Sequence, residues 1–119
     1  MSDVTTRELL YRASDLLERP TSDTVGLWPR ATAVLTRQAL ERGLIEVLSP
    51  QVHGIEQASV RAQLLCLQIL LDDTATADDV NVTWYALSRA CHHLSYELPP
   101  TAAELRAWID VVDRFVEAS

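Results

Sequence analysis

Apolar residues recur every three to four positions along most of the 119-residue chain, which is the period of α-helices that pack on a hydrophobic core. No stretch alternates apolar and polar residues as a half-buried strand does. The periodic segments predict five helices, at about 6–18, 29–48, 56–71, 78–98 and 102–117. We therefore expect an all-α fold, an up-and-down helical bundle of four core helices plus one additional helix, in a single domain over 1–119.

Local signals mark several helix ends. Pro29 suits the first turn of a helix, whereas Pro99 and Pro100 must end the preceding one. Three threonines each stand three residues before an acidic residue, the spacing of a capping box in which each side chain satisfies the other residue's backbone N–H. These pairs are Thr5 with Glu8, Thr76 with Asp79, and Thr101 with Glu104.

The segment 56–71 differs from the other helices because apolar residues cover most of its circumference. One stripe comprises Val60, Leu64, Leu67 and Leu71, and the remaining surface carries Leu65, Cys66, Ile69 and Leu70. Such a helix is either central in its domain or exposed on one side and covered by a partner, for example in a homodimer. Both interpretations stay open at this point.

Composition narrows the function classes. The net charge of −7 argues against general binding to DNA. No apolar run is long enough to span a membrane, and the start of the chain lacks the layout of a signal peptide, so we expect a cytoplasmic protein. Cys66 and Cys91 lack metal-site spacing and are expected to be free core thiols. The three glycines are scattered, so no nucleotide-binding loop is predicted and no cofactor is expected.

The predicted helix 78–98 carries the candidate site. Its core seam comprises Val80, Trp84, Leu87, Cys91, Leu94 and Leu98. Its opposite side carries Tyr85, Arg89, His92, His93 and Tyr96. Solvated helix faces favour Glu, Lys, Gln and Ala, so a face rich in His and Tyr is expected to contact something.

Three kinds of contact fit this face. It can pack against another helix or a dimer partner, since Tyr, Arg and His are common at interfaces. It can direct chemistry at a phosphate or at RNA, because Arg89 and His93 are four residues apart and can converge on one point. A metal site is the weakest interpretation: His93 and Glu97 could share a cation, but further ligands are missing, and we expect no metal.

Two segments resemble HEPN-type helical proteins. The segment LTRQALERGLIEVLS (35–49) is similar to their long first core helix, and LSRACHHLSYELPPTAAELRAWI (87–109) is similar to the final helices of small actinobacterial HEPN-like proteins. Together with RAQLLCL (61–67), the resemblance covers about half the chain. It implies a helical up-and-down bundle, usually a homodimer. Active members are metal-independent ribonucleases, often toxins or defence effectors of toxin–antitoxin type, while inactive members bind nucleotides or partner proteins.

In the ribonucleases of this superfamily, an Arg is followed after four to six residues by a His at the dimer interface. Here His92 and His93 follow Arg89 after only two and three residues, and Tyr96 stands where a His could follow after six. The first expectation is therefore a HEPN-like homodimeric interaction module whose Tyr85, Arg89, His92, His93 and Tyr96 face engages a partner protein or an RNA or nucleotide ligand. The alternative is a divergent metal-independent ribonuclease, in which Arg89 stabilises the phosphoryl charge and His93, or failing that His92, is the general base. The sequence leaves open whether the protein is an enzyme.

Overall fold

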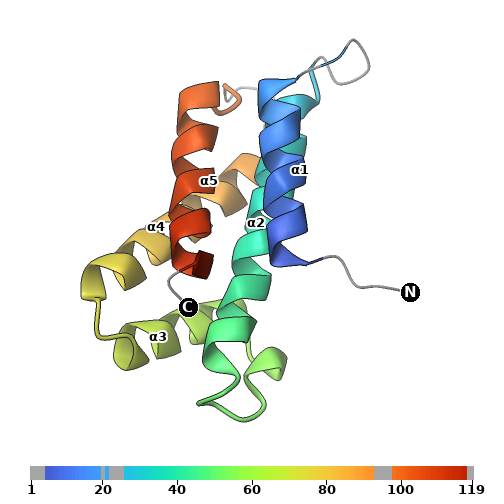
Figure 1. Ribbon diagram of the computed structural model, residues 1–119. Helices are drawn as coiled ribbons and strands as arrows, with labels where there is room; N and C mark the ends of the chain where they lie inside the picture. Colours follow the sequence, from blue (N-terminus) through green and yellow to red (C-terminus); the bar gives the residue numbers. More distant parts are fainter. Residues whose placement is uncertain (1–4, 20, 22–25, 93–97, 118–119) are drawn as a thin grey trace.

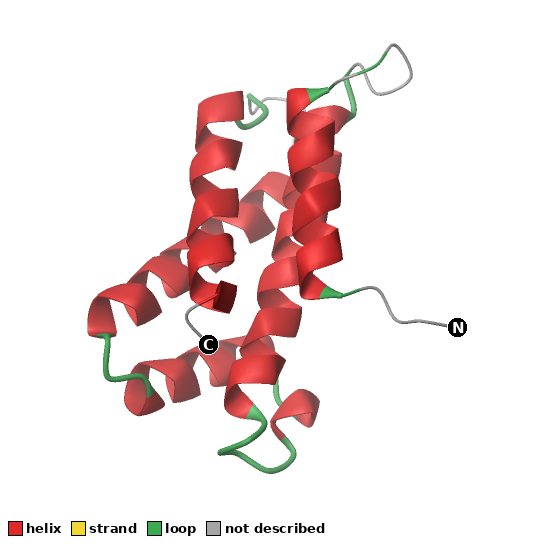
Figure 2. Ribbon diagram, viewed as in Figure 1, coloured by secondary structure: helices red, strands yellow, loops and turns green. Residues whose placement is uncertain are grey.

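The computed structural model describes residues 5–19, 21, 26–92 and 98–117 (Figure 1). Within these residues the regular structure is entirely helical (Figure 2). The helices are α1 (Thr6–Glu18), α2 (Trp28–Leu48), η1, a 3₁₀ turn (Ile55–Gln57), α3 (Val60–Leu70), α4 (Thr74–Cys91) and α5 (Ala102–Glu117). The predicted all-α class is confirmed, and the bounds of α1, α2 and α5 agree with the prediction to within one residue.

The central element is α2. It packs against α1, α3, α4 and α5, and its inward side is fully buried. In Figure 1, α1, α2 and α5 lie side by side, while α4 and α3 cross them at an angle. Small residues permit this close packing: a Cβ on Gly43 of α2 would lie only 3.2 Å from the Val116 side chain of α5. Of the two interpretations left open for the 56–71 segment, the central position is therefore wrong.

The helix α3 lies at the edge of the domain and is shorter than predicted. Only Gln63, Leu64 and Leu67 are buried, whereas Ile69 is 81% exposed. The helix begins at Val60 rather than at 56, because Gly54 has a φ of +81° and the chain then makes a single 3₁₀ turn. Ser59 caps the start of α3 by accepting a hydrogen bond from the N–H of Ala62 at 3.1 Å.

One of the three predicted capping boxes forms with both of its hydrogen bonds, and a second shows the cap from its threonine. The Glu8 N–H donates to Thr5 Oγ1 at 3.0 Å, and Thr101 and Glu104 cap one another reciprocally at 2.9 and 3.1 Å. The prediction for Thr76 with Asp79 is wrong, because α4 begins one turn earlier. Asp73 is its N-cap: it accepts from the Thr76 N–H at 3.2 Å and from Thr76 Oγ1 at 2.7 Å. A carboxylate is the stronger N-cap, and it takes Thr76 as its partner.

Polar contacts on the surface hold α1 against α5. Arg7 pairs with Asp113 at 3.1 Å and with Glu117 at 2.7 Å, and Arg106 pairs with Glu18 at the other end. These contacts show that α1 and α5 run antiparallel. Both cysteines are free and half-buried against the core, as expected. No helix among the described residues is long and apolar enough to cross a membrane.

Candidate binding groove between α4 and α5

The predicted polar face lies on the last turns of α4. Tyr85 and Arg89 point outward and are exposed, and His92, the residue that follows the helix, is exposed as well. His93 and Tyr96 lie outside the described residues, and so do Leu94 and Glu97.

The helix ends earlier than the sequence predicted. It stops at Cys91, and Leu98 is non-helical with a side chain that is 93% exposed, so Leu98 does not belong to the core seam. A contact from α2 accompanies this end: Arg30 Nε donates to the carbonyl of Cys91 at 3.0 Å, satisfying one of the carbonyls that a helix end leaves without a partner. The His92 N–H turns back to the Arg89 carbonyl at 3.2 Å, which tightens the last turn.

The exposed side of α4 forms one wall of an open groove of about 780 Å³. Tyr85 and Arg89 line it from α4, Trp108 from α5, and Pro99 and Pro100 from the connection between them. Leu98, Thr101 and Glu104 complete the described lining together with Ala86 and Ala90. The sequence therefore identified two residues of this site, but it assigned Trp108 and Leu98 to the core.

The α5 wall is positioned by the capping box. The reciprocal hydrogen bonds between Thr101 and Glu104 fix the first turn of α5. Trp108 follows Glu104 by four residues and so lies on the same side of the helix one turn later. Trp108 is half-buried and packs partly against the core, which leaves the remainder of its indole to line the groove.

The α4 wall is held from behind by a polar cluster. Glu41 Oε2 accepts hydrogen bonds from Arg37 Nε at 3.0 Å and from Trp84 Nε1 at 2.9 Å, and the Arg37 guanidinium lies 5.6 Å from the Trp84 ring centre. Burial acts to lower the pKa of Arg37, but the hydrogen bond and the charge of Glu41 outweigh it and raise that pKa above its ordinary value. Arg37 and Glu41 thus form an ion pair four residues apart on α2, and Trp84 of α4 joins it through its indole N–H.

This cluster also orients Tyr85. The Tyr85 ring meets the Trp84 ring edge to face, with centroids 5.0 Å apart and planes at 80°. On its other side the guanidinium of Arg61 lies 6.0 Å from the Tyr85 ring centre. Tyr85 thus contacts two neighbours and presents the rest of its ring to the groove.

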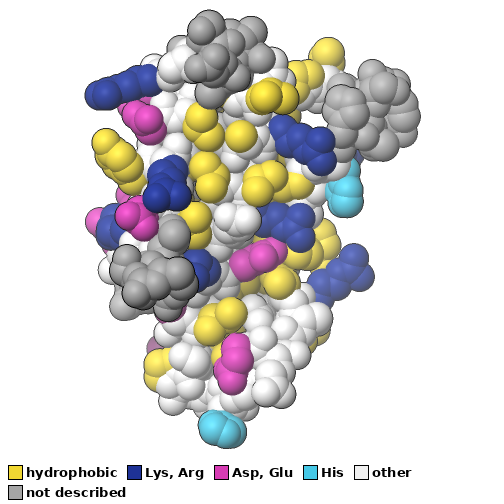
Figure 3. Space-filling view, turned by 90° about the vertical axis from the view of Figure 1, so that its right-hand side faces the viewer, with side chains coloured by type: hydrophobic (Ala, Val, Ile, Leu, Met, Phe, Trp, Pro, Cys, Tyr) yellow, Lys and Arg dark blue, Asp and Glu magenta, His cyan; other side chains and the backbone are white. Residues whose placement is uncertain are grey.

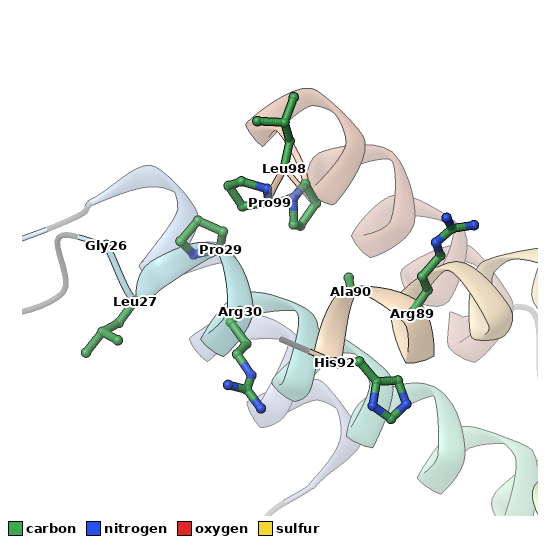
Figure 4. Close-up of a pocket in the computed structure, with 10 residues that line it drawn as sticks. Gly26, Leu27, Pro29, Arg30, Arg89, Ala90, His92, Leu98 and Pro99 are labelled. Atoms are coloured by element: carbon green, nitrogen blue, oxygen red, sulfur yellow. The ribbon is translucent and has the colours of Figure 1, made fainter. Parts of the chain in front are cut away.

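A second, smaller cavity of about 360 Å³ lies at the end of α4 (Figure 4). Arg89 and His92 both line it, together with Arg30, Pro29 and Leu98. In Figure 4, Arg89 and His92 extend from the chain in different directions, and Arg30 points toward the side of His92. Arg89 and His92 therefore do not converge on one point in this structure. Because His93 lies outside the described residues, the ribonuclease alternative stays a prediction.

The charges on the surface are mixed. On the side of the molecule shown in Figure 3, which is the right-hand side of Figure 1, basic side chains in dark blue are separated by acidic and hydrophobic ones. Among the described residues, no three His, Cys, Asp or Glu side chains gather as metal ligands do, and His53 is exposed in the loop before η1. The lining residues of the groove give it aromatic and apolar surface together with Arg89 and Glu104.

Comparison with known proteins adds no family to this picture. No protein-family model matches the chain, and neither the curated proteins nor the solved structures include one with significant similarity.

Proposed function

We propose that this protein is a non-catalytic, HEPN-like interaction module whose groove between α4 and α5 receives an extended segment of a partner protein. The HEPN-like assignment, including an up-and-down bundle with one additional helix, rests on the resemblance of 35–49 and 87–109. One observation carries the binding function: Tyr85 and Trp108, 23 residues apart in sequence, line the same open groove of about 780 Å³.

The lining favours a peptide over RNA. Aromatic side chains supply large, rigid contact area and are enriched in protein interfaces, and Pro99 and Pro100 add a stiff apolar edge. Arg89 is the only basic residue among the described lining residues, and the whole chain has a net charge of −7. A protein that binds RNA through phosphate contacts needs several basic residues together. We therefore expect the bound segment to carry apolar side chains and an acidic residue near Arg89.

A peptide library displayed on phage tests this proposal. The peptides selected on the wild-type protein become the probes, and fluorotryptophan labelling reports where they bind. The chain has three tryptophans. Bound peptide should shift the ¹⁹F resonance of Trp108, which lines the groove, and leave that of Trp28, which does not, in place. Selection of no peptide, or a shift of Trp28 alone, contradicts the proposal.

Matched variants sharpen the test. We expect Tyr85→Ala and Leu98→Ser to weaken peptide binding about tenfold or more. Tyr11→Ser is the control, because Tyr11 is 70% exposed on α1 and does not line the groove. A fluorescent single-stranded RNA is assayed in parallel. If the wild type binds this RNA and Tyr85→Ala does not, the groove is an RNA site and the peptide proposal is wrong. If the wild type cleaves RNA and Arg89→Ala does not, the ribonuclease alternative replaces the proposal.

A further inference from the structure

A second surface lies on the outer side of α3 and α4 and adjoins the groove at Tyr85 and Arg89. Its centre is apolar: Leu65 is 63% exposed, Ile69 81% and Val82 65%. These side chains are neighbours because α3 and α4 run antiparallel to one another. Gln68 Nε2 donates to Asp78 Oδ1 at 3.3 Å near one end of the pair, and Arg61 lies over the Tyr85 ring near the other. Leu65 and Val82 fall between these two contacts, and Ile69 follows one turn further along α3.

The two ends of this surface carry opposite charge. Arg61 lies at one end, with Arg89 beyond it on α4, while Asp78 and Asp72 lie at the other, and all four residues are exposed. On α4 the charge of Arg89 interacts favourably with the helix dipole, because Arg89 lies in the last turn, at the negative end of the dipole. On α3 the charges oppose the dipole, because Arg61 stands in the first turn and Asp72 follows the last. The stability of α3 alone does not explain this placement.

We infer that this outer face of α3 and α4 is the interface of a homodimer. A twofold rotation about an axis near Leu65 and Val82 turns the surface end for end, so that the basic end of each copy meets the acidic end of the other. The rotation also places the exposed apolar centre of one copy on that of its partner, which removes it from water. Arg61 of each copy then pairs with Asp78 of the other, so each interface contains this ion pair twice. No other partner is required for the charges to match.

This interface gives the homodimer expected from the sequence a specific surface, which shares only its border with the peptide groove. The groove is closed by Leu98 and Trp108 on the α5 side, which this interface leaves untouched. Tyr85 and Arg89 lie at the border of both surfaces and are therefore not varied in the test of the dimer. The two proposals can fail separately. A protein that binds peptide but does not dimerise contradicts only the interface, and one that dimerises but binds no peptide contradicts only the groove.

The first test is the mass in solution, measured by sedimentation from about 1 to 200 µM, the range expected for an interface of modest size. We expect the wild type to dimerise, and Ile69→Glu and Val82→Glu to be monomers with unchanged helix content. The control is Tyr11→Glu, which introduces the same charge at an equally exposed aromatic on α1 and should stay dimeric. A monomeric wild type, or a dimer that survives both Glu substitutions, overturns the inference.

Charge exchange tests the orientation. In Arg61→Asp both pairs across the interface become acidic, and in Asp78→Arg both become basic, so each variant alone should dimerise roughly tenfold more weakly or worse. When the two variants are mixed, the introduced aspartate of one chain faces the introduced arginine of the other, and the two unchanged residues face one another as in the wild type. The heterodimer therefore regains both ion pairs, and mass measurements on the mixture should show a dimer at concentrations where each variant alone is a monomer. Dimers in both single variants, or no gain on mixing, refute the twofold arrangement.

Discussion

The most direct test of how the site is supported is the removal of the Glu41 carboxylate. One oxygen of this group, Oε2, accepts hydrogen bonds from both Arg37 and Trp84. The Trp84 residue is only 8% exposed, whereas the Glu41 side chain is 30% exposed. In Glu41→Ala the indole N–H loses its acceptor at a position where water has little access, while the Arg37 guanidinium can still turn to solvent.

The magnitude follows from these exposures. Leaving a mostly buried N–H without a partner costs about 1–2 kcal/mol. The Arg37–Glu41 pair lies four residues apart and is about one-third exposed, so it contributes only about 0.5 kcal/mol. We therefore expect Glu41→Ala to lower the free energy of unfolding by about 2 kcal/mol, and for a domain of this size that lowers Tm by about 8 °C. Glu41→Gln keeps an acceptor for Trp84 and should cost about half as much.

The assay is urea unfolding followed by circular dichroism, applied to a double-mutant cycle. Trp84→Phe keeps an aromatic ring but removes the N–H, so in a Trp84→Phe background the loss of Glu41 should cost about 1 kcal/mol less than in the wild type. Strictly additive effects of the two substitutions, or a Glu41→Ala variant within about 0.5 kcal/mol of the wild type, would show that the hydrogen bond does not hold the α4 wall.

Four smaller predictions concern the scaffold, each checked by thermal or urea unfolding. Leu87 is fully buried, so Leu87→Ala should cost about 3 kcal/mol and lower Tm by about 12 °C. Thr101→Ala removes one half of the α5 capping box and should cost about 1 kcal/mol. Gly54→Ala should cost about 1 kcal/mol, because Gly54 has a φ of +81° that a Cβ disfavours. Hydrogen bonds from the Thr76 side chain and backbone lower the pKa of Asp73 below its ordinary value of 3.8. The stability that the Asp73 carboxylate contributes is therefore present above pH 3.8 and is lost as the pH falls through the lower pKa of the folded state. Asp73→Asn should accordingly make the Tm depend less on pH in this acid range.

Much of the fold could be predicted because the local and the tertiary preferences agree. The apolar stripes of α1, α2 and α5 are regular, and their ends carry Thr5, Pro29 and the Thr101–Glu104 box. The prediction failed where a distant contact decides the outcome. Nothing in the sequence near Cys91 shows that α4 ends there, and the contact that stabilises this end comes from Arg30, 61 residues earlier. The buried surface of α3 was likewise undecidable, because its composition fits both a central helix and an exposed one.

In the candidate site, too, the sequence predicts what depends on one helix alone and misses what depends on how two helices meet. The helical wheel correctly predicts that Tyr85 and Arg89 point away from the core, because that depends only on the period of α4. It cannot predict Trp108 as part of the site, since Trp108 belongs to the apolar stripe of α5 and becomes a groove wall only through the angle at which α5 meets α4. The one available signal was the connection itself: Pro99 and Pro100 directly precede the Thr101 cap, so these apolar residues lie next to the first turn of α5, where they line the groove.

The composition of α4 is explained once each of its sides has a role. Its inner side packs Val80, Trp84 and Leu87 into the core, as most amphipathic helices do. The remaining circumference is divided between the groove and the outer face it shares with α3, and Tyr85 stands at the boundary, held by Trp84 on one side and Arg61 on the other. A Lys or Glu at this position would suit solvent better but could not stack against two neighbours at once. The two proposed roles, a peptide groove on one outer side and a dimer interface on the other, would explain why α4 carries aromatic and planar residues where an exposed helix would carry flexible charged ones.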